Sequence, residues 1–231
     1  AEQAAAYLLS GLSHELRTPI GTILTHLEIA SLPDISPETK QQSMRLLKAE
    51  TQRMSRLVNQ MLELGRLETS AGIEQQLLDP VALAEQALAQ VTPQAAEQEI
   101  DLCLESGARV PPVVGDPDRL MQVFLNLLDN AVKYARSGDQ AVISLDKGED
   151  GVECAICDTG PGIPARHLPH ITQRFYRAAP QRIEGSGLGL ALVQEILRRH
   201  DSRLEIESQA EGAETGTCVR FVLPTLPEEE A

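Results

Sequence analysis

Apolar side chains recur at steps of three and four along the N-terminal part of the chain, in two runs. The first run comprises Leu9, Leu12, Leu16, Ile20, Ile23 and Leu27, and the second comprises Met44, Leu47, Met54, Val58 and Met61, with Thr51 and Gly65 at the same spacing. This spacing places each set on one face of an α-helix. Ser36-Pro37 supplies a cap and a first residue for the second helix, and the turn formers of residues 31–35 join the two. The pattern predicts a helical hairpin with a heptad seam.

The predicted hairpin, residues 1–70, carries too little apolar surface to form a core by itself. Two copies that pair into a four-helix bundle would bury both seams against each other. The alternative is a hairpin that packs against the second half of its own chain. We favour the dimeric four-helix bundle because it accounts for both seams at once.

The periodicity changes after residues 69–72, where short strand-like runs begin to alternate with helical ones. Strand-like runs cover residues 141–146, 152–157, 204–208 and 218–223, and predicted helices follow Pro80, Asp116-Pro117 and Gly187. This mixture predicts an α/β layer domain over residues 80–226. Residues 71–79 are then a linker, and residues 227–231 form an acidic tail.

The formal net charge of −14 argues against nucleic acid as a partner, because affinity there comes mainly from Lys and Arg placed at phosphates. A small phosphate ligand responds to local charge instead. Four arginines gather in one acid-poor segment: Arg166, Arg174, Arg177 and Arg182. The sequence contains no run of about 18 apolar residues, and its first residues lack the pattern of a signal peptide. We expect that this chain does not itself cross a membrane.

Two of the four cysteines stand in the segment Cys154-Ala155-Ile156-Cys157, a spacing that can indicate a redox or zinc site. Here the surrounding alternation is that of a strand, which would direct the two sulfurs to opposite faces. Both kinds of site are therefore disfavoured. The expectation is that the cysteines are core thiols in a reducing compartment.

A histidine at the start of the first predicted helix stands in the segment Ser13-His14-Glu15-Leu16-Arg17-Thr18-Pro19. A zinc protease motif needs a second histidine four residues after the first, and that position is Thr18. At about 100° per residue, His14 points away from the apolar seam. Glu15 could accept the proton of one ring nitrogen and leave the other free to attack an electrophile.

Two residues close to His14 in the sequence fit the interpretation that His14 is a reactive residue. Thr18 lies one turn further on nearly the same face, where it could position a water molecule. Pro19 removes a backbone donor and should bend the helix. The alternative is that His14 is an ordinary solvated or structural histidine.

The predicted helix after Asp116 carries polar residues at i, i+4 and i+7, which are Asn126, Asn130 and Lys133. They share one face, opposite the apolar face of the same helix. Amide oxygens suit a hydrated magnesium ion, and an ammonium group suits phosphates. The alternative is a plain solvated face.

Two glycine-containing segments follow. In residues 158–164, Asp158 could accept a hydrogen bond from an exocyclic amine such as that of adenine, and the glycines let the backbone approach a flat base. Residues 185–190 open a helix, whose N-terminal amides favour phosphate. They form neither a P-loop nor a dinucleotide-binding motif, since the required partner residues are missing. Between them, the arginine-bearing segment around Phe175 is long enough to act as a lid.

With these residues together, nearly the whole chain resembles a sensor histidine kinase of two-component signalling. Short segments match that family's motifs in order, namely the H box (13–19), N box (126–134), G1 box (158–162), F box (174–177), G2 box (185–189) and the final Gly216-Thr217 element. The resemblance implies a dimeric hairpin followed by an α/β sandwich ATP-binding domain of the gyrase, chaperone and histidine kinase type. The departure from the family is His200-Asp201-Ser202, where relatives commonly have His-Gly-Gly.

The resemblance also implies roles for the reacting residues. His14 would be the phosphoacceptor and Glu15 the base that activates it. Thr18 would position water when the kinase instead dephosphorylates its partner. Asn130 would bind Mg²⁺, and Asn126 would lie close to the phosphates of ATP.

Further roles follow for the residues around the nucleotide. Lys133 would contact phosphate, Tyr134 would stack on adenine, and Asp158 would read the adenine amine. Either Arg177 or Arg182 would meet the γ-phosphate. The pocket would be shaped by Gly160, Gly162, Gly185, Gly187, Leu188, Gly189 and Thr217.

The family's partners are a second copy of the chain and the receiver domain of a response regulator, whose aspartate takes the phosphoryl group. The resemblance further implies phosphatase activity towards that regulator. It places the chain in the cytoplasm, attached to a membrane through segments outside this sequence. Two other functions stay open, a conformational ATPase of the same superfamily and a dimeric scaffold without turnover.

Overall fold

The computed structural model describes residues 2–69, 74–178, 185–212 and 214–226. By its internal contacts the chain divides into two compact units, Ala1–Gly65 and Arg66–Ala231. Each unit is described by itself below. Within the described residues, no helix is both long enough and apolar enough to cross a membrane.

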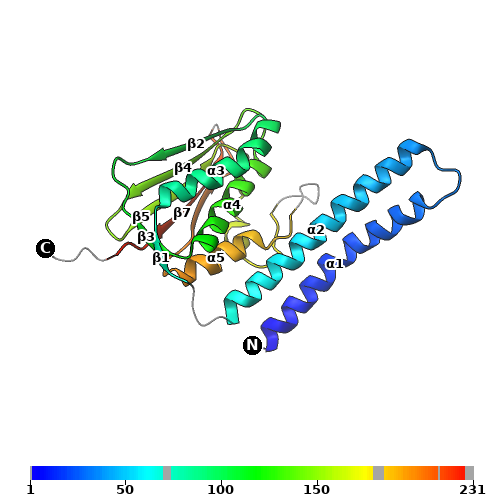
Figure 1. Cartoon of the computed structure of the whole chain (residues 1–231), viewed down its shortest axis with the longest axis horizontal. Helices are drawn as coiled ribbons and strands as arrows, with labels where there is room; N and C mark the ends of the chain where they lie inside the picture. Colours follow the sequence, from blue (N-terminus) through cyan, green and yellow to red (C-terminus); the bar gives the residue numbers. More distant parts are fainter. Residues whose placement is uncertain (1, 70–73, 179–184, 213, 227–231) are drawn as a thin grey trace. The chain divides into compact units, whose positions relative to one another are not determined.

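The first unit is built from two long helices, α1 (Glu2–Ala30) and α2 (Pro37–Thr69), joined by a short turn (Figure 1). The predicted hairpin is therefore confirmed. The Ser36 hydroxyl accepts the Thr39 backbone N–H at 3.2 Å and so caps α2, as the Ser-Pro signal predicts. Pro19 lies buried inside α1, which continues as one helix to Ala30. The hydroxyl of Thr22 donates to the carbonyl of Thr18 at 3.2 Å beside it.

Much of the apolar surface of the hairpin is exposed. Leu57 and Leu64, one heptad apart, are buried at 2% exposure each. The large apolar side chains that stay at least two-fifths exposed along the described parts of α1 and α2 are Ile20, Leu24, Leu27, Met44, Leu46, Val58 and Leu62. Several of these belong to the predicted seam.

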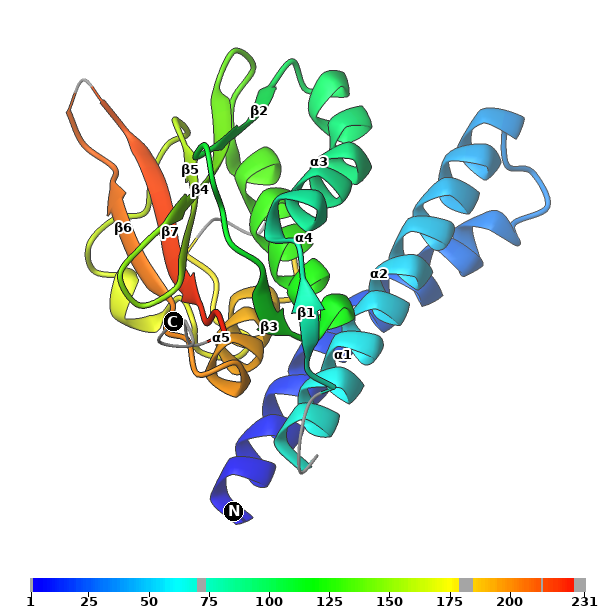
Figure 2. The ribbon, with the colours of Figure 1, turned by 60° about the vertical axis from the view of Figure 1, so that its left-hand side comes forward.

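The second unit is an α/β sandwich. Its sheet has the strand order β2-β4-β5-β7-β6, with β2 and β4 parallel and the other neighbours antiparallel. The strands are β2 (Asp101–Ser106), β4 (Gln140–Lys147), β5 (Val152–Asp158), β6 (Glu205–Gln209) and β7 (Gly216–Leu223). One face is covered by the helices α3 (Pro80–Glu97), α4 (Pro117–Tyr134) and α5 (Gly189–Arg199) (Figures 1 and 2). The predicted α/β layers are confirmed.

Two of the helices begin at an aspartate followed by proline. The Asp79 carboxylate accepts the N–H groups of the second and third helical residues of α3. The Asp116 carboxylate does the same for α4. Each cap satisfies backbone donors that the first helical turn leaves unpaired, and each proline occupies the first position, where no donor is needed. The Asp116 cap fixes the start of α4, the helix that carries Asn126, Asn130 and Lys133.

The core lies between the sheet and the helices. One side of α4 supplies seven buried residues, Leu120, Val123, Phe124, Leu127, Leu128, Ala131 and Val132. The ring of Phe124 meets that of Phe221 on β7, with 5.9 Å between centroids. Asn126, Asn130 and Lys133 lie outside this buried side of α4 and are half-buried, so the predicted separation of a polar and an apolar side is present.

Three short strands were not predicted from the sequence. A small sheet pairs β1 (Gln76–Leu78) with β3 (Val113–Gly115), and β2 forms one edge of the main sheet. β1 falls inside the range 71–79 that the sequence assigns to a linker. That segment therefore includes a strand of the second unit.

The cysteines differ from expectation. Cys154 is buried and free while Cys157 is half-buried, so the two sulfurs do lie on opposite faces of β5. Burial raises the pKa of the Cys154 thiol, which therefore stays protonated. However, Cys157 is bonded to Cys218 in a disulfide, so the prediction that all four cysteines are free thiols is wrong for this pair. The antiparallel register of β5 and β7 sets them directly opposite each other, with 4.0 Å between Cα atoms.

Candidate functional site

The polar stripe of α4 faces the glycine-rich start of α5. The amide nitrogen of Asn126 donates to the Gln122 carbonyl at 2.8 Å, which fixes the side chain and directs its oxygen outward. A Cβ at Gly189 would lie 3.1 Å from that oxygen. The N box and the G2 box of the sequence therefore meet here. Asn130, one turn along from Asn126, is half-buried on the same side of α4.

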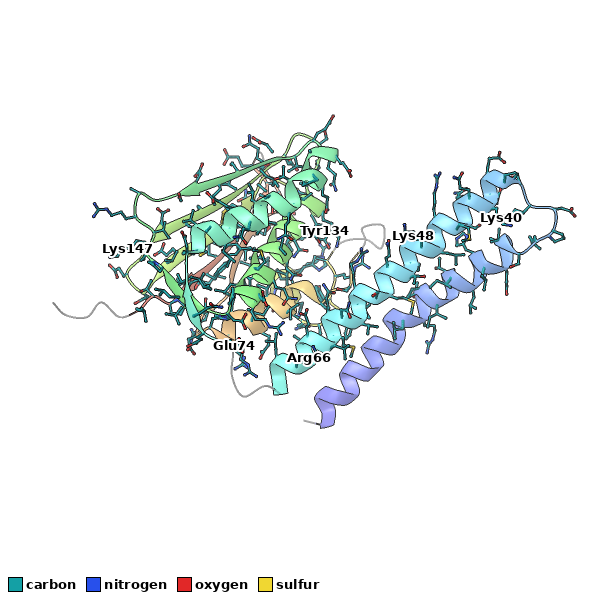
Figure 3. The ribbon with its side chains drawn as sticks, viewed as in Figure 1. Lys40, Lys48, Arg66, Glu74, Tyr134 and Lys147 are labelled. Carbon is teal, nitrogen blue, oxygen red and sulfur yellow. A yellow bond between two sulfur atoms is a disulfide. The ribbon has the colours of Figure 1, made fainter. Side chains whose placement is uncertain are left out.

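The far end of the stripe carries Lys133 and Tyr134, the last residues of α4. The ammonium of Lys133 lies 5.0 Å from the centroid of the Tyr134 ring, and Figure 3 marks Tyr134 at the C-terminal end of the helix. A Cβ at Gly185 would lie 2.6 Å from the Lys133 nitrogen, so the backbone of Gly185 lies close to the flexible end of this side chain. An ammonium group is thus held beside a backbone that carries no side chain, which suits a phosphate.

The side chain of Tyr134 is partly buried. Burial raises the pKa of its phenol, the nearby charge of Arg177 lowers it, and Asp129 raises it. The phenol is therefore neutral at ordinary pH. The influence of Arg177 on this pKa also places the F-box arginine near the end of α4. A neutral aromatic ring beside two cations is a suitable surface for a base or a phosphate ester.

The F box and the G2 box are connected through their backbones. The N–H of Phe175 donates to the carbonyl of Gly187 at 2.8 Å. Both residues have positive φ, 63° and 68°. A Cβ at Gly187 would lie 2.7 Å from the carbonyl carbon of Phe175, so position 187 admits only glycine. The two motifs form one backbone junction at the entrance to α5.

Asp158 ends β5 and is held by backbone donors. Its carboxylate accepts the Gly160 N–H at 2.9 Å and the N–H of Thr217 on the adjacent strand. Burial nevertheless raises the pKa of Asp158 above its ordinary range, the two N–H groups offset part of this rise, and Asp139 adds to it. A partly buried carboxylate that backbone donors orient can accept a hydrogen bond from an amine on a ligand.

A hollow of about 300 Å³ is lined by residues at the ends of β5, β6 and β7. Its lining includes Asp158, Ser208 and Thr217, but none of the α4 stripe. The hollow and the α4 stripe are therefore separate features of this unit. The Asp158 end suits the flat base of a ligand and the α4 stripe suits its phosphates.

The remaining predicted residues are placed as follows. His14 and Glu15 lie on α1 of the first unit, and their side chains are outside the described residues, as is all of Arg182. Thr18 is exposed. Leu188 is fully buried, so its side chain belongs to the core.

Sequence reasoning missed Ser208, whose hydroxyl bonds to Ile163, Gly216 and Thr217. It also missed Asp139, which accepts the N–H of Arg136 at 2.7 Å and faces Asp158. A single serine in a strand carries no pattern that marks it, and Asp139 sits in a turn where acidic residues are common.

Two family models match the chain. One, described as the His Kinase A (phospho-acceptor) domain, matches residues 4–70. The other, described as Histidine kinase-, DNA gyrase B-, and HSP90-like ATPase, matches residues 115–227.

Relatives among curated proteins cover the same span. The chain is 33% identical over 221 residues to drug sensory protein A of Synechocystis sp., which is 90% of this chain and 33% of that protein. It is 32% identical over 231 residues to the signal transduction histidine-protein kinase/phosphatase MprB of Mycobacterium leprae, with 96% and 44% covered. The chain therefore spans about a third to a half of the length of these relatives.

Solved structures show the same likeness. A mycobacterial sensor histidine kinase MprB matches with TM-score 0.58 and 30% identity, over 67% of this chain and 99% of that chain. The histidine kinase ThkA, solved in complex with the response regulator protein TrrA, matches with TM-score 0.80 and 22% identity, over 97% and 63%. The second likeness concerns the fold alone.

Proposed function

Because the chain belongs to the sensor histidine kinases of two-component signalling, we propose that it is an ATP-dependent protein-histidine kinase that phosphorylates its own His14. The observation that carries the proposal is the meeting of the α4 stripe with the G2 glycines, at Asn126 with Gly189 and at Lys133 with Gly185. This is an arrangement of amide, ammonium and bare backbone suited to a triphosphate.

In the proposed reaction, one ring nitrogen of His14 attacks the γ-phosphorus of ATP while Glu15 accepts a hydrogen bond from the other. An N–P bond forms, the P–O bond to the β-phosphate breaks, and ADP leaves. Lys133 and Arg177 or Arg182 stabilise the charge on the transferring group. Asp158 holds the adenine amine and Tyr134 stacks on the base. His14 and the nucleotide-binding residues belong to separate units, so transfer requires the two units to bring them together.

Magnesium would neutralise charge on the phosphates during transfer. Among the described residues, no cluster of three or more His, Cys, Asp or Glu side chains could hold a metal ion. The residues present fit an ion that keeps most of its water and takes phosphate oxygens, with Asn130 as its amide ligand.

Pairing of two chains through the hairpin is supported by its exposed apolar side chains. Ile20, Leu24 and Leu27 lie at i, i+4 and i+7 on α1 and are 44%, 55% and 53% exposed. A stripe of this kind is costly to leave in water. A second hairpin would cover it and complete a four-helix bundle.

The partner proposed for phosphoryl transfer is the receiver domain of a response regulator, which would dock on the hairpin and take the group on an aspartate. The likeness to ThkA, whose structure includes a response regulator, supports this partner. Phosphatase activity is proposed from Thr18, one turn beyond His14, and a relative is named as kinase/phosphatase. The site of action is proposed to be the cytoplasm.

The test is incubation with γ-labelled ATP and magnesium, comparing the wild type with His14→Ala. The matched control is His26→Ala, since His26 is a second histidine of α1. We expect acid-labile, alkali-stable label in the wild type and the control, and none in His14→Ala. Label retained by His14→Ala would overturn the assignment. Hydrolysis of ATP that is unchanged in His14→Ala, with no protein label in any variant, would favour a conformational ATPase. Nucleotide binding without turnover would favour a scaffold.

A further inference from the structure

The segment between the G1 box and the F box is a run of tight turns that its side chains close. The backbone N–H groups of His167, His170, Gln173 and Tyr176 each donate to the carbonyl three residues before, at 2.8 to 3.1 Å. Across these turns, Nδ1 of His167 lies 2.7 Å from the hydroxyl oxygen of Tyr176. The ring of His170 packs on the same tyrosine, with 5.4 Å between centroids. Tyr176, a residue of the F box, is therefore held by side chains as well as by its backbone.

The direction of the hydrogen bond between His167 and Tyr176 follows from Arg166. The Nε of Arg166 donates to Nε2 of His167 at 3.2 Å. A guanidinium group can only donate, so Nε2 is an acceptor, and the single proton of the neutral ring is on Nδ1. The hydroxyl oxygen of Tyr176 therefore accepts from Nδ1–H of His167.

The residue before Tyr176 adopts a backbone conformation that needs support. Phe175 has a φ of 63°, in the left-handed region, which is costly for a residue with a bulky side chain. Its N–H is bonded to the Gly187 carbonyl at 2.8 Å. On its other side, His167 holds the Tyr176 side chain. A strained residue persists only where its surroundings fix it, so the bonds on both sides of Phe175 determine how the chain enters Arg177.

Arg177 follows directly and acts at the C-terminal end of α4. Its side chain is half-buried. Burial raises the pKa of the Tyr134 phenol, and the charge of Arg177 opposes that rise, so the guanidinium group lies near this ring. The Lys133 ammonium lies 5.0 Å from the centroid of the same ring. Two cations thus lie around one aromatic side chain, at the end of the stripe that suits phosphates.

We propose that His167 and Tyr176 are positioning residues for phosphoryl transfer, because their hydrogen bond keeps the F-box turn in the form that directs Arg177 to the γ-phosphate. The inference rests on the proposed ATP-binding function. ADP has no γ-phosphate for Arg177 to meet. Loss of the bond should therefore weaken the binding of a triphosphate more than that of a diphosphate, whereas a purely structural role would weaken both alike.

The test measures the affinities for ADP and for a non-hydrolysable β,γ-imido analogue of ATP, by calorimetry in the presence of magnesium. Tyr176→Phe removes the hydroxyl and keeps the ring, and His167→Ala removes the donor. In each variant we expect the affinity for the analogue to fall about five- to tenfold, with ADP affinity changed by less than about twofold. The control is Gln173→Ala, because Gln173 belongs to the same turns but has an exposed side chain that bonds to His170. It should match the wild type.

Further variants separate positioning from general loosening, through the ratio of analogue affinity to ADP affinity. His167→Asn keeps an N–H donor in the place of Nδ1 and should restore most of this ratio. The double variant His167→Ala with Tyr176→Phe should lose no more than either single variant, since both remove one bond. Arg177→Met should lower the ratio by itself, and adding Tyr176→Phe to it should lower the ratio no further.

Several outcomes would overturn the proposal. They are an unchanged ratio in His167→Ala and Tyr176→Phe, equal losses for the two nucleotides, an unchanged ratio in Arg177→Met, and a loss from Tyr176→Phe that persists in full beside Arg177→Met. If His167→Ala does not fold, Tyr176→Phe decides the outcome, since it removes only the hydroxyl oxygen. Failure of the wild type to bind ADP would instead overturn the proposed function.

Discussion

At the scale of single residues, the proposed role of Asp158 in nucleotide binding predicts that ADP affinity depends on pH. Burial raises its pKa, with Asp139 adding to the rise, and the N–H groups of Gly160 and Thr217 offset part of it. Protonation converts one of its acceptor oxygens into a donor. We expect ADP affinity to weaken as pH falls through this raised pKa, at a higher pH than an ordinary aspartate would give. Asp158→Asn should bind ADP about ten- to a hundredfold more weakly, with that pH dependence lost. Calorimetric titrations across the acidic range would measure both.

The same shift affects folding. A raised pKa means that the folded protein holds the proton more tightly than the unfolded one. The stability from Asp158 is therefore complete below the ordinary aspartate pKa and is lost as pH rises through the raised value. Asp158→Asn should gain stability relative to the wild type over this window in urea titrations. Parallel pH profiles for the two proteins would contradict the burial argument.

The place of a residue in the candidate site could be predicted from the sequence only where the residue belonged to a local, periodic pattern. The i, i+4, i+7 stripe of α4 could be predicted because helical periodicity fixes which side chains share a face. Ser208 could not, since its role arises from strand neighbours that only the sheet register brings together. Cys157 and Cys218 are likewise 61 residues apart, and no local pattern pairs them.

At the scale of elements, His200 connects the end of α5 to the start of α4. Its ring is 1% exposed, with Nδ1 bonded to the Ile196 carbonyl at 2.8 Å and Nε2 accepting the N–H of Asp116 at 3.0 Å. His200→Ala leaves a cavity and an unpaired donor at the cap of the helix that carries the stripe. We expect the free energy of unfolding to fall by about 2–4 kcal/mol. Urea titration would measure this, with His170→Ala, at an exposed histidine, staying within about 0.5 kcal/mol of the wild type. A loss below 1 kcal/mol in His200→Ala would contradict this role.

The disulfide joins β5 to β7 beside the base end of the site, since Cys157 precedes Asp158 and Cys218 follows Thr217. It closes a long loop, so reduction should lower the free energy of unfolding by about 2–4 kcal/mol. Urea titrations with and without a reducing agent would measure the change. The matched control, Cys157→Ala with Cys218→Ala, should be insensitive to the reducing agent. An equal response from this control would contradict the assignment.

The elements that could be predicted are those with strong local signals. Asp79 and Asp116, each followed by proline, fixed two helix starts because caps depend on neighbours in sequence. β1 and β3 are three residues each, too short to show alternation. β2 pairs in parallel with β4, which is distant in the sequence. Its own six residues therefore give no clear local signal for a strand.

At the scale of the whole molecule, the proposed pairing of two chains through the hairpin can be tested at the exposed stripe of α1. Leu24 is 55% exposed, midway along the stripe formed with Ile20 and Leu27. Leu24→Glu would place a charge inside the proposed four-helix bundle, where an unpaired charge is strongly destabilising. We expect the dimer dissociation constant to rise at least a hundredfold, measured by analytical ultracentrifugation. The control is Leu32→Glu, because Leu32 is as exposed, at 59%, but lies in the turn between the helices. It should remain a dimer. A Leu24→Glu protein that dimerises like the wild type would show that this stripe faces something else, and autophosphorylation of a dissociated Leu24→Glu protein would show that one chain suffices for the chemistry.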